Sequence, residues 1–590
     1  MTFLSRVKYY LPALLLLLFG AVVAACGPAA EPIVEEEPTV EDDMADEDDM
    51  ADEDDMADED DMADEDDMAD EDDMADEDMA DLPADPFIDV GVRQALAYLI
   101  DRDEIIDRSV QGFADPLYSQ VPPGFLGANE AFLDVYGSGA DVAAAEELLR
   151  DAGYSEDNPL TFDLWYPPEH YGAYAAQIFQ VLEEQFEATP LIQVELQTQE
   201  WSTYVGAAIS GEYNISYLGW FFDYPDPSNY IEPFALCDAT IGTFYCSDEM
   251  DGFLNSARAS TDQDERADLY GQAQTLYAED VVTIPLTLET EYVVLNDARV
   301  SDVVIGPAFD FNYELTTFAD GVEDTSDLLV GTTDQVTSLD YQDAYAVHDW
   351  ELFRNTNVGL YIFEPGTANV VPGVAAGDPV FDAEANTYTI EIEEGWLYPD
   401  GTELVAGDFV RAIERGLALA EESDVASTLL PPYVTGAEAP DDRTLVLSVD
   451  GPIGFFTQLL TSAAYMPVPE GAFPDDSLTP FPDTLVGVGP WQIVEYTENE
   501  QTVLERNPNY REGFPEGAPE RVIITYYQDP QTMGLAVENG EIDVAWRILG
   551  PIEASRLGEV EGLTAIDTGG GSIRYLVINH IGITAATSEE

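Results

Sequence analysis

The chain has 590 residues, of which 46% are hydrophobic and 11% aromatic, so it contains enough apolar material to build more than one lobe with a sizeable core. Its 121 acidic residues outnumber its 19 basic residues, the formal net charge is -102 at pH 7, and Lys8 is the only lysine. Binding to nucleic-acid phosphates requires a basic surface, so this composition excludes a nucleic-acid-binding protein.

The first residues have the pattern of an export signal. A basic start is followed by an apolar run at residues 11–23 and by Val-Ala-Ala-Cys at residues 23–26. This pattern resembles a bacterial lipoprotein signal, which implies that residues 1–25 form a signal peptide and that Cys26 is lipidated and anchors the protein to a membrane. The alternative is a transmembrane helix, which requires about 20 apolar residues where this run has about 13.

Residues 26–85 are strongly acidic. Most of their acidic side chains belong to a six-residue repeat of Met-Ala-Asp-Glu-Asp-Asp that begins at Met44. Charge repulsion and the lack of apolar bulk keep such a segment unfolded, so we expect a disordered tether. The repeat lacks the glycine and the ligand order of a calcium loop, so a specific metal site is not expected in it.

From residue 86 onward the sequence has the composition of a globular protein, and stretches with helical and strand-like patterns alternate. Gly153 is expected to end one of the helices in the left-handed conformation. Alternation of strands and helices of this length predicts α/β lobes. The expected helices are at residues 92–110, 141–152 and 171–186, and the expected strands at residues 160–165, 192–197 and 215–220.

A second series of elements begins after about Asp320. No internal repeat relates it to the first series, so the two halves are not copies of one another. The expected strands are at residues 328–332, 388–393, 498–505, 521–527 and 573–578, and the expected helices at residues 406–420 and 533–538.

Beyond Cys26 the chain contains two cysteines, Cys237 and Cys246. Their short spacing favours a local disulfide in an oxidising compartment over two free thiols. Zinc binding by this pair is not expected, because two thiols are half of a tetrahedral set and no histidine lies near them in the sequence. The three histidines are far apart without ligand spacing, so neither a metal centre nor a cofactor is expected.

Several stretches of both halves, taken together, resemble the peptide-type extracellular solute-binding proteins of ABC transporters, the oligopeptide/dipeptide group known as family 5. In the second half the similar stretches follow the family order from TSLD at 337–340 through WLYPDGTELVAGDFVRAIER at 396–415, GVGPW at 487–491, LERNPNY at 504–510 and ENGEIDV at 538–544 to YLVIN at 575–579. In the first half they are VRQALAY at 92–98, IDR at 100–102, AEELLRDAGY at 145–154 and GWFFDYPDP at 219–227.

The order of the two halves departs from the family. In the family the YLVIN strand leads directly into the RQALA helix, whereas here the strand lies near the C-terminus and the helix just after the tether. Joining Glu590 to about Pro86 would restore an ordinary member, so we expect a circular permutation. The alternative is a gene fusion or an assembly artefact that joins halves of two neighbours. The permutation would leave one covalent crossing between the lobes, near residues 291–300.

The resemblance implies a circularly permuted, two-lobed α/β fold like that of periplasmic binding proteins, of type II and the large peptide-binding subclass. The second lobe is expected at residues 86–290, the core of the first lobe at residues 291–345 and 475–590, and an accessory subdomain of the first lobe at residues 346–474.

The resemblance also implies a ligand site in the GWFFD segment. By position, Gly219 and Phe221 would offer backbone groups to an extended peptide, Asp223 would meet its α-ammonium, and Trp220 would form an apolar wall. The alternative is that Asp223 merely starts the Tyr-Pro-Asp-Pro turn.

The function implied is capture of oligo- or dipeptides outside the cytoplasm, at the cell surface or on the periplasmic side, and their delivery to the permease of an ABC importer by a lipid-anchored monomer. The chain has no Gly-x-Ser-x-Gly elbow, His-Glu-x-x-His helix or phosphate loop, so an enzyme is not expected. Two alternatives remain open. The scaffold could bind a sugar, a nickel complex or an opine, or the chain could be an acidic surface or calcium-buffering lipoprotein without a role in transport.

Overall fold

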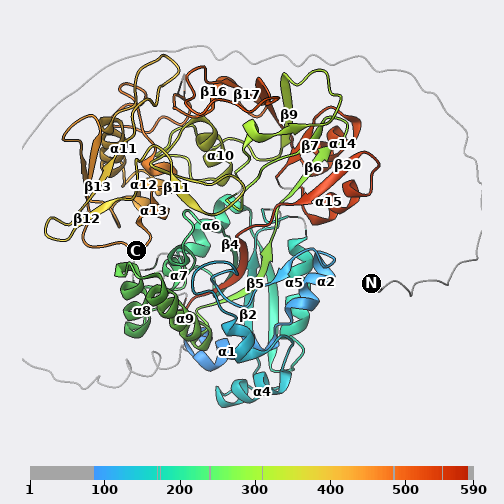
Figure 1. Ribbon diagram of the computed structural model, residues 1–590. Helices are drawn as coiled ribbons and strands as arrows, with labels where there is room; N and C mark the ends of the chain where they lie inside the picture. Colours follow the sequence, from blue (N-terminus) through green and yellow to red (C-terminus); the bar gives the residue numbers. More distant parts are fainter. Residues whose placement is uncertain are drawn as a thin grey trace, which may run out of the picture. The chain divides into compact units, whose positions relative to one another are not determined.

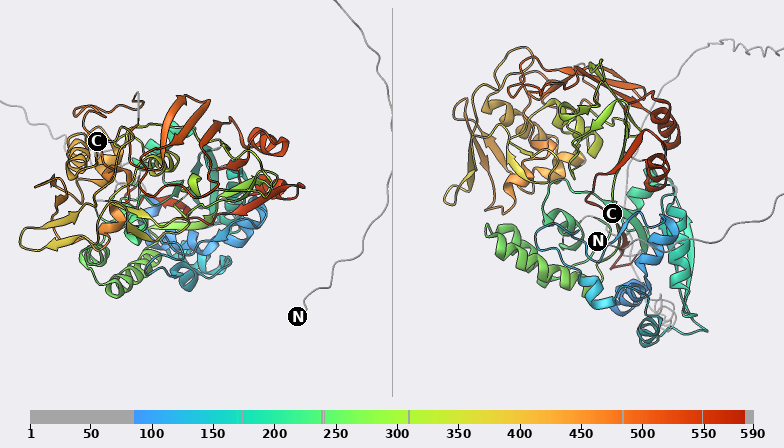
Figure 2. Two further views of the ribbon diagram at one scale, coloured as in Figure 1. Left: turned by 45° about the horizontal axis from the view of Figure 1, so that its top comes forward. Right: turned by 45° about the vertical axis from the view of Figure 1, so that its right-hand side comes forward.

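A computed structural model describes residues 85–582 apart from residues 169, 173, 238, 240, 309, 483, 484 and 548, and describes Ser202 without its side chain. The predicted signal peptide, the lipidation site Cys26 and the tether up to residue 84 lie outside the described residues. The described chain forms two lobes, one built on a six-stranded and one on a seven-stranded sheet (Figures 1 and 2). The predicted two-lobed α/β fold is therefore confirmed.

The second lobe, at the bottom of Figure 1, is built on the six-stranded sheet of order β1-β5-β21-β4-β2-β3. Its strands are β1 (Asp115–Pro116), β2 (Leu160–Tyr166), β3 (Ile192–Thr198), β4 (Ile215–Trp220), β5 (Thr283–Glu289) and β21 (Ser572–Ile578). Its helices are η1 (Pro86–Ile88), α1 (Val90–Leu99), α2 (Arg102–Ser109), α3 (Ala131–Tyr136), α4 (Val142–Asp151), α5 (Ala175–Phe186), α6 (Trp201–Ile209), α7 (Pro227–Ala235), α8 (Asp248–Ala259) and α9 (Gln263–Asp280).

Local capping explains where two of these helices begin and end. Asp141 accepts a hydrogen bond from the backbone N–H of Ala144 (3.0 Å) at the start of α4, and Gly153 follows its end with a φ of +99°. The single helix expected at residues 92–110 is wrong. Ile100 is extended and the Asp101 carboxylate caps a new helix by accepting from the N–H of Glu104 (3.0 Å), so the segment divides into α1 and α2.

The first lobe is built on the seven-stranded sheet of order β16-β17-β18-β9-β19-β6-β20. Its strands are β6 (Tyr292–Asn296), β9 (Asp327–Thr332), β16 (Trp491–Thr497), β17 (Gln501–Arg506), β18 (Arg521–Tyr526), β19 (Val544–Trp546) and β20 (Leu563–Asp567), with the separate pair β7 (Val300–Asp302) and β8 (Thr317–Phe318). Its helices are η2 (Tyr313–Leu315), α10 (Val347–Thr356), α14 (Pro530–Asn539) and α15 (Pro551–Gly558).

The accessory subdomain contains a four-stranded sheet of order β12-β13-β15-β14 and the hairpin β10-β11. It shares one hydrophobic core with the first lobe, in which Trp350, Trp491 and Trp546 are almost fully buried. Its elements are β10 (Tyr361–Phe363), β11 (Val370–Pro372), β12 (Val380–Asp382), β13 (Thr387–Glu391), α11 (Ala406–Ala418), α12 (Asp424–Leu429), β14 (Gly436–Glu438), β15 (Thr444–Ser448), α13 (Phe456–Leu459) and η3 (Ala463–Tyr465).

The chain crosses between the lobes twice, and the two crossings lie side by side. One joins β5 to β6 through residues 290–291, and the other joins β20 to β21 through residues 568–571. They are bonded to each other, because the backbone N–H of Thr568 (3.0 Å) and its hydroxyl (2.9 Å) both donate to the carbonyl of Glu291. In Figure 1 the red C-terminal strand β21 enters the lobe that is otherwise coloured blue to green.

The expectation of a single crossing is therefore wrong. Strand β21 lies in the sheet of the second lobe, antiparallel to both β4 and β5, although it was expected in the first lobe. Long-range strand pairing decides its place, and its partners β4 and β5 come from the opposite half of the chain.

The two ends of the described chain meet on the second lobe. The Asn214 amide donates a hydrogen bond to the Asp85 carboxylate, and a Cβ added at Gly582 would lie 2.6 Å from the Cβ of Asp85. Gly582 is held by its backbone N–H, which donates to Asn579 Oδ1 (2.9 Å). Residues 85 and 582 are thus in contact.

Candidate functional site

The predicted ligand segment begins at the end of β4. This strand pairs with β21 along its length, with Gly219 opposite Arg574, but it pairs with β2 only at Ile215 and Ser216. Beyond Ser216 the backbone of β4 forms hydrogen bonds on its β2 side with a tyrosine side chain instead of with β2. The Tyr204 hydroxyl donates to the carbonyl of Tyr217 (2.9 Å) and accepts from the N–H of Tyr217 (2.7 Å). The end of β4 therefore separates from β2 but stays paired with β21.

Gly219 lies beneath two side chains of the second lobe. A Cβ at this position would lie 2.6 Å from Arg574 Nη1 and 2.9 Å from the ring of Tyr171, so only glycine fits here. The Arg574 guanidinium is itself held by an ion pair with Glu289 (2.8 Å). In this conformation Arg574 and Tyr171 pack over the α-carbon of Gly219, and its backbone is hydrogen-bonded to the side chains of Tyr171 and Tyr575.

Asp223 is buried, with 5% of its surface exposed. Its Oδ2 accepts hydrogen bonds from Asn229 Nδ2 (2.9 Å) and from the Tyr345 hydroxyl (3.2 Å), and its backbone N–H donates to Asn229 Oδ1 (2.9 Å). Within the part of the chain that the structure describes, no ion pair involves this carboxylate. Burial raises its pKa to about 6, against the effect of both hydrogen bonds.

Asp223 does not cap the helix that follows the turn. The carboxylate that caps α7 belongs to Asp226, which accepts from the N–H of Ser228 (3.0 Å) and forms an ion pair with Arg266 (2.7 Å). The Asp223 side chain is instead directed to Asn229 and to Tyr345 of the first lobe.

Trp220 and Phe221 are both half-buried beside this carboxylate. The Trp220 indole N–H donates to Asn229 Oδ1 (3.2 Å), the same oxygen that accepts from the backbone of Asp223. Phe221 packs against the cores of both lobes. Asn229 thus ties Trp220 to Asp223, and its role was not predicted, because a single asparagine inside a helix gives no signal in the sequence.

The segment after Asp223 docks on the accessory subdomain. The Tyr224 ring stacks on Phe455 with 5.1 Å between centroids, and its hydroxyl is hydrogen-bonded to that of Tyr433 (3.0 Å). Together with the bond between Tyr345 and Asp223, these contacts place the site at the boundary of the lobes.

Charged and aromatic groups of both lobes also meet near the crossings. The pKa of His170 is lowered to about 4, mainly by burial and then by the charge of Arg574, whereas the charge of Asp334 in the first lobe opposes this shift. On the first-lobe side, Asp334 lies 3.9 Å from Arg547, which forms an ion pair with Glu351 (3.0 Å). The boundary therefore carries both signs of charge.

Among the described residues, no three or more His, Cys, Asp or Glu side chains are grouped so that they could hold a metal ion. No helix within the described ranges is long and apolar enough to cross a membrane.

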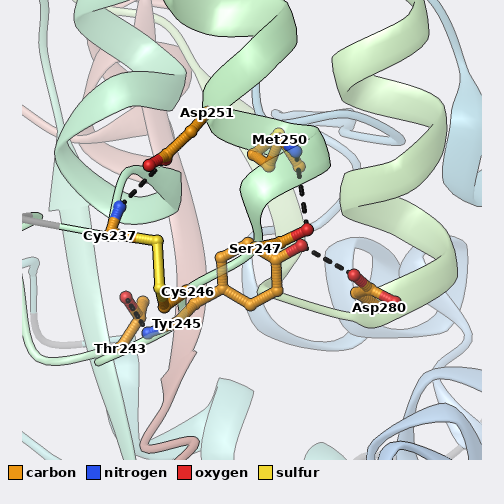
Figure 3. The surroundings of a disulfide bond; sticks show 8 residues. All are labelled: Cys237, Thr243, Tyr245, Cys246, Ser247, Met250, Asp251 and Asp280. Carbon is orange, nitrogen blue, oxygen red and sulfur yellow. Dashed lines mark hydrogen bonds between the residues drawn. A yellow bond between two sulfur atoms is a disulfide. The ribbon is translucent and has the colours of Figure 1, made fainter.

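Cys237 and Cys246 form a disulfide in the structure, between the end of α7 and the start of α8 (Figure 3). The backbone N–H of Cys237 donates to Asp251 Oδ1 (3.1 Å), and Ser247 caps α8 through the N–H of Met250 (3.5 Å). The loop is thereby attached at both of its ends to α8.

The sequence model described as bacterial extracellular solute-binding proteins, family 5 Middle, matches residues 71–241 and 369–582. Di/tripeptide-binding protein 3 of Pseudomonas aeruginosa (strain UCBPP-PA14) is 31% identical over 227 residues, which cover 38% of this chain and 41% of that protein. The dipeptide-binding protein of Escherichia coli (strain K12) is 28% identical over 235 residues, 39% of this chain and 43% of that protein. The chain thus spans less than half of the length of these curated relatives.

Solved structures show similarity over a comparable share of the chain. The oligopeptide-binding protein AppA of Bacillus subtilis in complex with a nonapeptide is 21% identical, with a TM-score of 0.33 and coverage of 37% of this chain and 43% of that chain. NikZ of Campylobacter jejuni in complex with Ni(L-His) is 18% identical, with a TM-score of 0.33 and coverage of 38% and 43%.

Proposed function

Because this chain belongs to the bacterial extracellular solute-binding proteins of family 5, whose sequence model matches more than half of it, we propose that it captures peptides with a free amino terminus and delivers them to an ABC importer. Membership of this family makes it a binding protein rather than an enzyme. The observation that carries the proposal is the Asp223 carboxylate, which is buried at the boundary of the lobes without an ion-pair partner among the described residues.

A peptide ammonium would supply the charge that Asp223 lacks. A buried carboxylate costs free energy until a cation or several hydrogen bonds compensate it, and a charge-assisted hydrogen bond in such a site is strong. Asn229 and Tyr345 fix the orientation of the carboxylate, and Trp220 and Phe221 would contact the apolar part of the ligand. The names of the relatives, which include di/tripeptide-binding and dipeptide-binding proteins, support a peptide.

One observation favours a second candidate, a compact non-peptide solute. The backbone of Gly219 is already hydrogen-bonded to the side chains of Tyr171 and Tyr575, so in this conformation it is not free for the pairing expected with an extended peptide. A solute recognised by side chains alone, such as an opine or a sugar, would not need that pairing.

Identification of the ligand that co-purifies with the protein separates these candidates. Native mass spectrometry of the purified protein, followed by release and fragmentation of the ligand, should yield di-, tri- or oligopeptides. Recovery of an opine or a sugar in stoichiometric amount would replace the first candidate by the second.

We also propose that Cys26 is lipidated and that the acidic segment tethers the two-lobed body to the membrane as a monomer, with the permease of the importer as its partner. The sequence pattern at residues 23–26 supports the anchor, and the family description supports an extracytoplasmic location.

The circular permutation is a further part of the proposal. Residues 85 and 582 are in contact, so joining the ends would restore the family order without displacing either one. The other boundary, between β8 and β9, is a loop with exposed residues such as Asp320 and Glu323. The halves also interlock, because β6 of the first half lies between β19 and β20 of the second, whereas β21 lies between β4 and β5. Interlocking favours one protein over a fusion of two neighbours.

A further inference from the structure

The first lobe contains a cavity of about 510 Å³ that is separate from the Asp223 site. Its lining residues come from residues 310–315, 354–365, 461–466 and 490–515, so it lies where the core of the first lobe meets the accessory subdomain. No lining residue belongs to the second lobe. Cavities of roughly 300 to 1,000 Å³ are typical of small-molecule sites.

Five aromatic residues line the cavity. Aromatic faces attract cations through their quadrupole and also bury apolar ligand surface. The Phe514 ring is held from outside by Trp491, with 5.3 Å between centroids, and by Arg506, whose guanidinium carbon lies 4.5 Å from its centroid. The aromatic lining residues are Phe311, Tyr361, Phe363, Tyr510 and Phe514.

Two carboxylates face this cavity without an ion-pair partner among the described residues, those of Glu314 and Glu512. Glu314 Oε2 is buried, and the side chain that interacts with this carboxyl is the uncharged indole of Trp491. Burial raises the pKa of Glu314, hydrogen bonds from its own backbone and from Trp491 oppose the shift, and the charge of Glu512 adds to it. Both carboxylates also raise the pKa of Tyr510, which donates a long hydrogen bond to Glu512 (3.4 Å).

The one arginine among the lining residues does not neutralise this charge. Arg354 forms an ion pair with Asp310, which also lines the cavity. The lining therefore retains an excess of negative charge at Glu314 and Glu512. The three lining amides are hydrogen-bonded within the protein. Asn312 and Asn355 each donate to two backbone carbonyls, and both ends of Asn357 are hydrogen-bonded.

We propose that this cavity binds a small amphipathic organic cation, with an ammonium group between Glu314 and Glu512 and an apolar body against the aromatic walls. The ammonium compensates two carboxylates that otherwise repel each other, and the walls select an apolar body over a hydrated metal ion. The proposal does not depend on the identity of the interlobe ligand, although the lining residue Phe363 contacts Phe222 of the predicted ligand segment (6.4 Å between ring centroids).

The test uses a matched set of probes and calorimetry on the purified protein. Phenethylammonium is the cation, phenethyl alcohol its neutral analogue and 3-phenylpropionate its anionic analogue. We expect saturable binding of the cation to one site, at least tenfold weaker binding of the alcohol and no binding of the anion. Absence of saturable binding of the cation, or equal affinity for the alcohol, overturns the proposal.

Two variants locate the site. Glu314→Gln and Glu512→Gln should each weaken binding of phenethylammonium at least tenfold, and the exposed Glu512 tolerates substitution even if Glu314→Gln impairs folding. Glu516→Gln, on the same loop but outside the lining, is the matched control and should bind normally. Asp223→Asn should bind the probe normally as well. Equal loss in the Glu516 variant, or loss in the Asp223 variant, would place the binding elsewhere and refute the site.

Discussion

The Tyr345 hydroxyl of the first lobe donates a hydrogen bond of 3.2 Å to Asp223 Oδ2 of the second lobe. Tyr345 itself is 39% exposed, so this bond lies at the edge of the boundary rather than inside either core. The Asp223 carboxylate, which we propose binds the ligand, therefore takes part in a contact between the lobes. We expect ligand binding and lobe closure to be coupled at this residue.

Asp223→Ala should weaken binding of a peptide with a free amino terminus by roughly 2 to 5 kcal/mol, because a buried charge pair loses one partner. Calorimetry of the wild type and the variant measures this change. N-acetylated peptides provide the control, since they lack the ammonium and should bind both proteins with equal, weak affinity. Unchanged affinity of the variant, or strong binding of acetylated peptide to the wild type, contradicts the assignment.

Peptide affinity should rise as the pH increases through about 6. Burial raises the pKa of the Asp223 carboxyl to about 6, so in the free protein this carboxyl is mostly protonated at pH 5, and the charged form that an ammonium needs prevails at pH 7. Binding should release a proton near pH 6, which appears as a buffer-dependent heat in calorimetry. Asp223→Asn should abolish both effects, and a variant that retains them shows that another group titrates.

The free energy of unfolding of the ligand-free protein should also depend on pH through the Asp223 carboxyl. Its pKa is raised from 3.8 to about 6, so between these values the folded protein binds more protons there than the unfolded chain, and its contribution to the free energy of unfolding falls as the pH rises. Asp223→Asn should therefore gain up to roughly 3 kcal/mol relative to the wild type at pH 7, and the difference should shrink toward pH 4. Urea unfolding of both proteins at pH 4 and pH 7 measures this difference in the free energy of unfolding. A difference that does not change with pH contradicts a raised pKa of Asp223.

The disulfide between Cys237 and Cys246 closes a short loop with a sequence separation of 9, so its loss should cost somewhat under about 3 kcal/mol. Intact-mass measurement checks the bond directly, because reduction must add two hydrogen atoms to the body. Alkylation of both cysteines before reduction would disprove it. Cys237→Ser should lower the thermal midpoint, and Ser247→Ala provides a comparison for loss of the neighbouring helix cap alone.

Local patterns in the sequence predict the regular elements best. Strands expected at residues 160–165, 192–197 and 215–220 are observed as β2, β3 and β4, and the expected end of α4 at Gly153 is confirmed. These features depend on alternation and capping within a few residues, which the sequence displays directly.

The same local patterns did not predict contacts between residues that are far apart in the sequence. The pairing of β21 with β4 and β5 joins residues more than 280 positions apart, as in the contact of Arg574 with Thr287. Alternation within a strand does not reveal its partner. For the same reason the sequence placed Asp223 in a candidate site but did not show that Asn229 and Tyr345 hold it.

The proposed circular permutation predicts that the two halves also fold in the order of the family. A rearranged chain that starts near Asp327, runs to Glu590 and continues from Pro86 to Asp320 should fold into the same two lobes. The new junction joins Glu590 to Pro86, so residues 583–590 connect residue 582 to Pro86, and residues 85 and 582 are in contact in the present order. The new ends fall in the loop between β8 and β9. Circular dichroism and thermal unfolding compare the two chains.

The rearranged chain should also bind the same ligand with the same affinity, to within about twofold, which corresponds to roughly 0.4 kcal/mol. Both crossings between the lobes, at residues 290–291 and 568–571, are covalent in either order, so the rearrangement neither adds nor removes a constraint on closure. Asp223→Ala in the rearranged chain is the control and should lose affinity as in the natural order. If the rearranged chain fails to fold while the natural order folds and binds, the halves do not complete one another, and a fusion of two truncated neighbours becomes the better explanation.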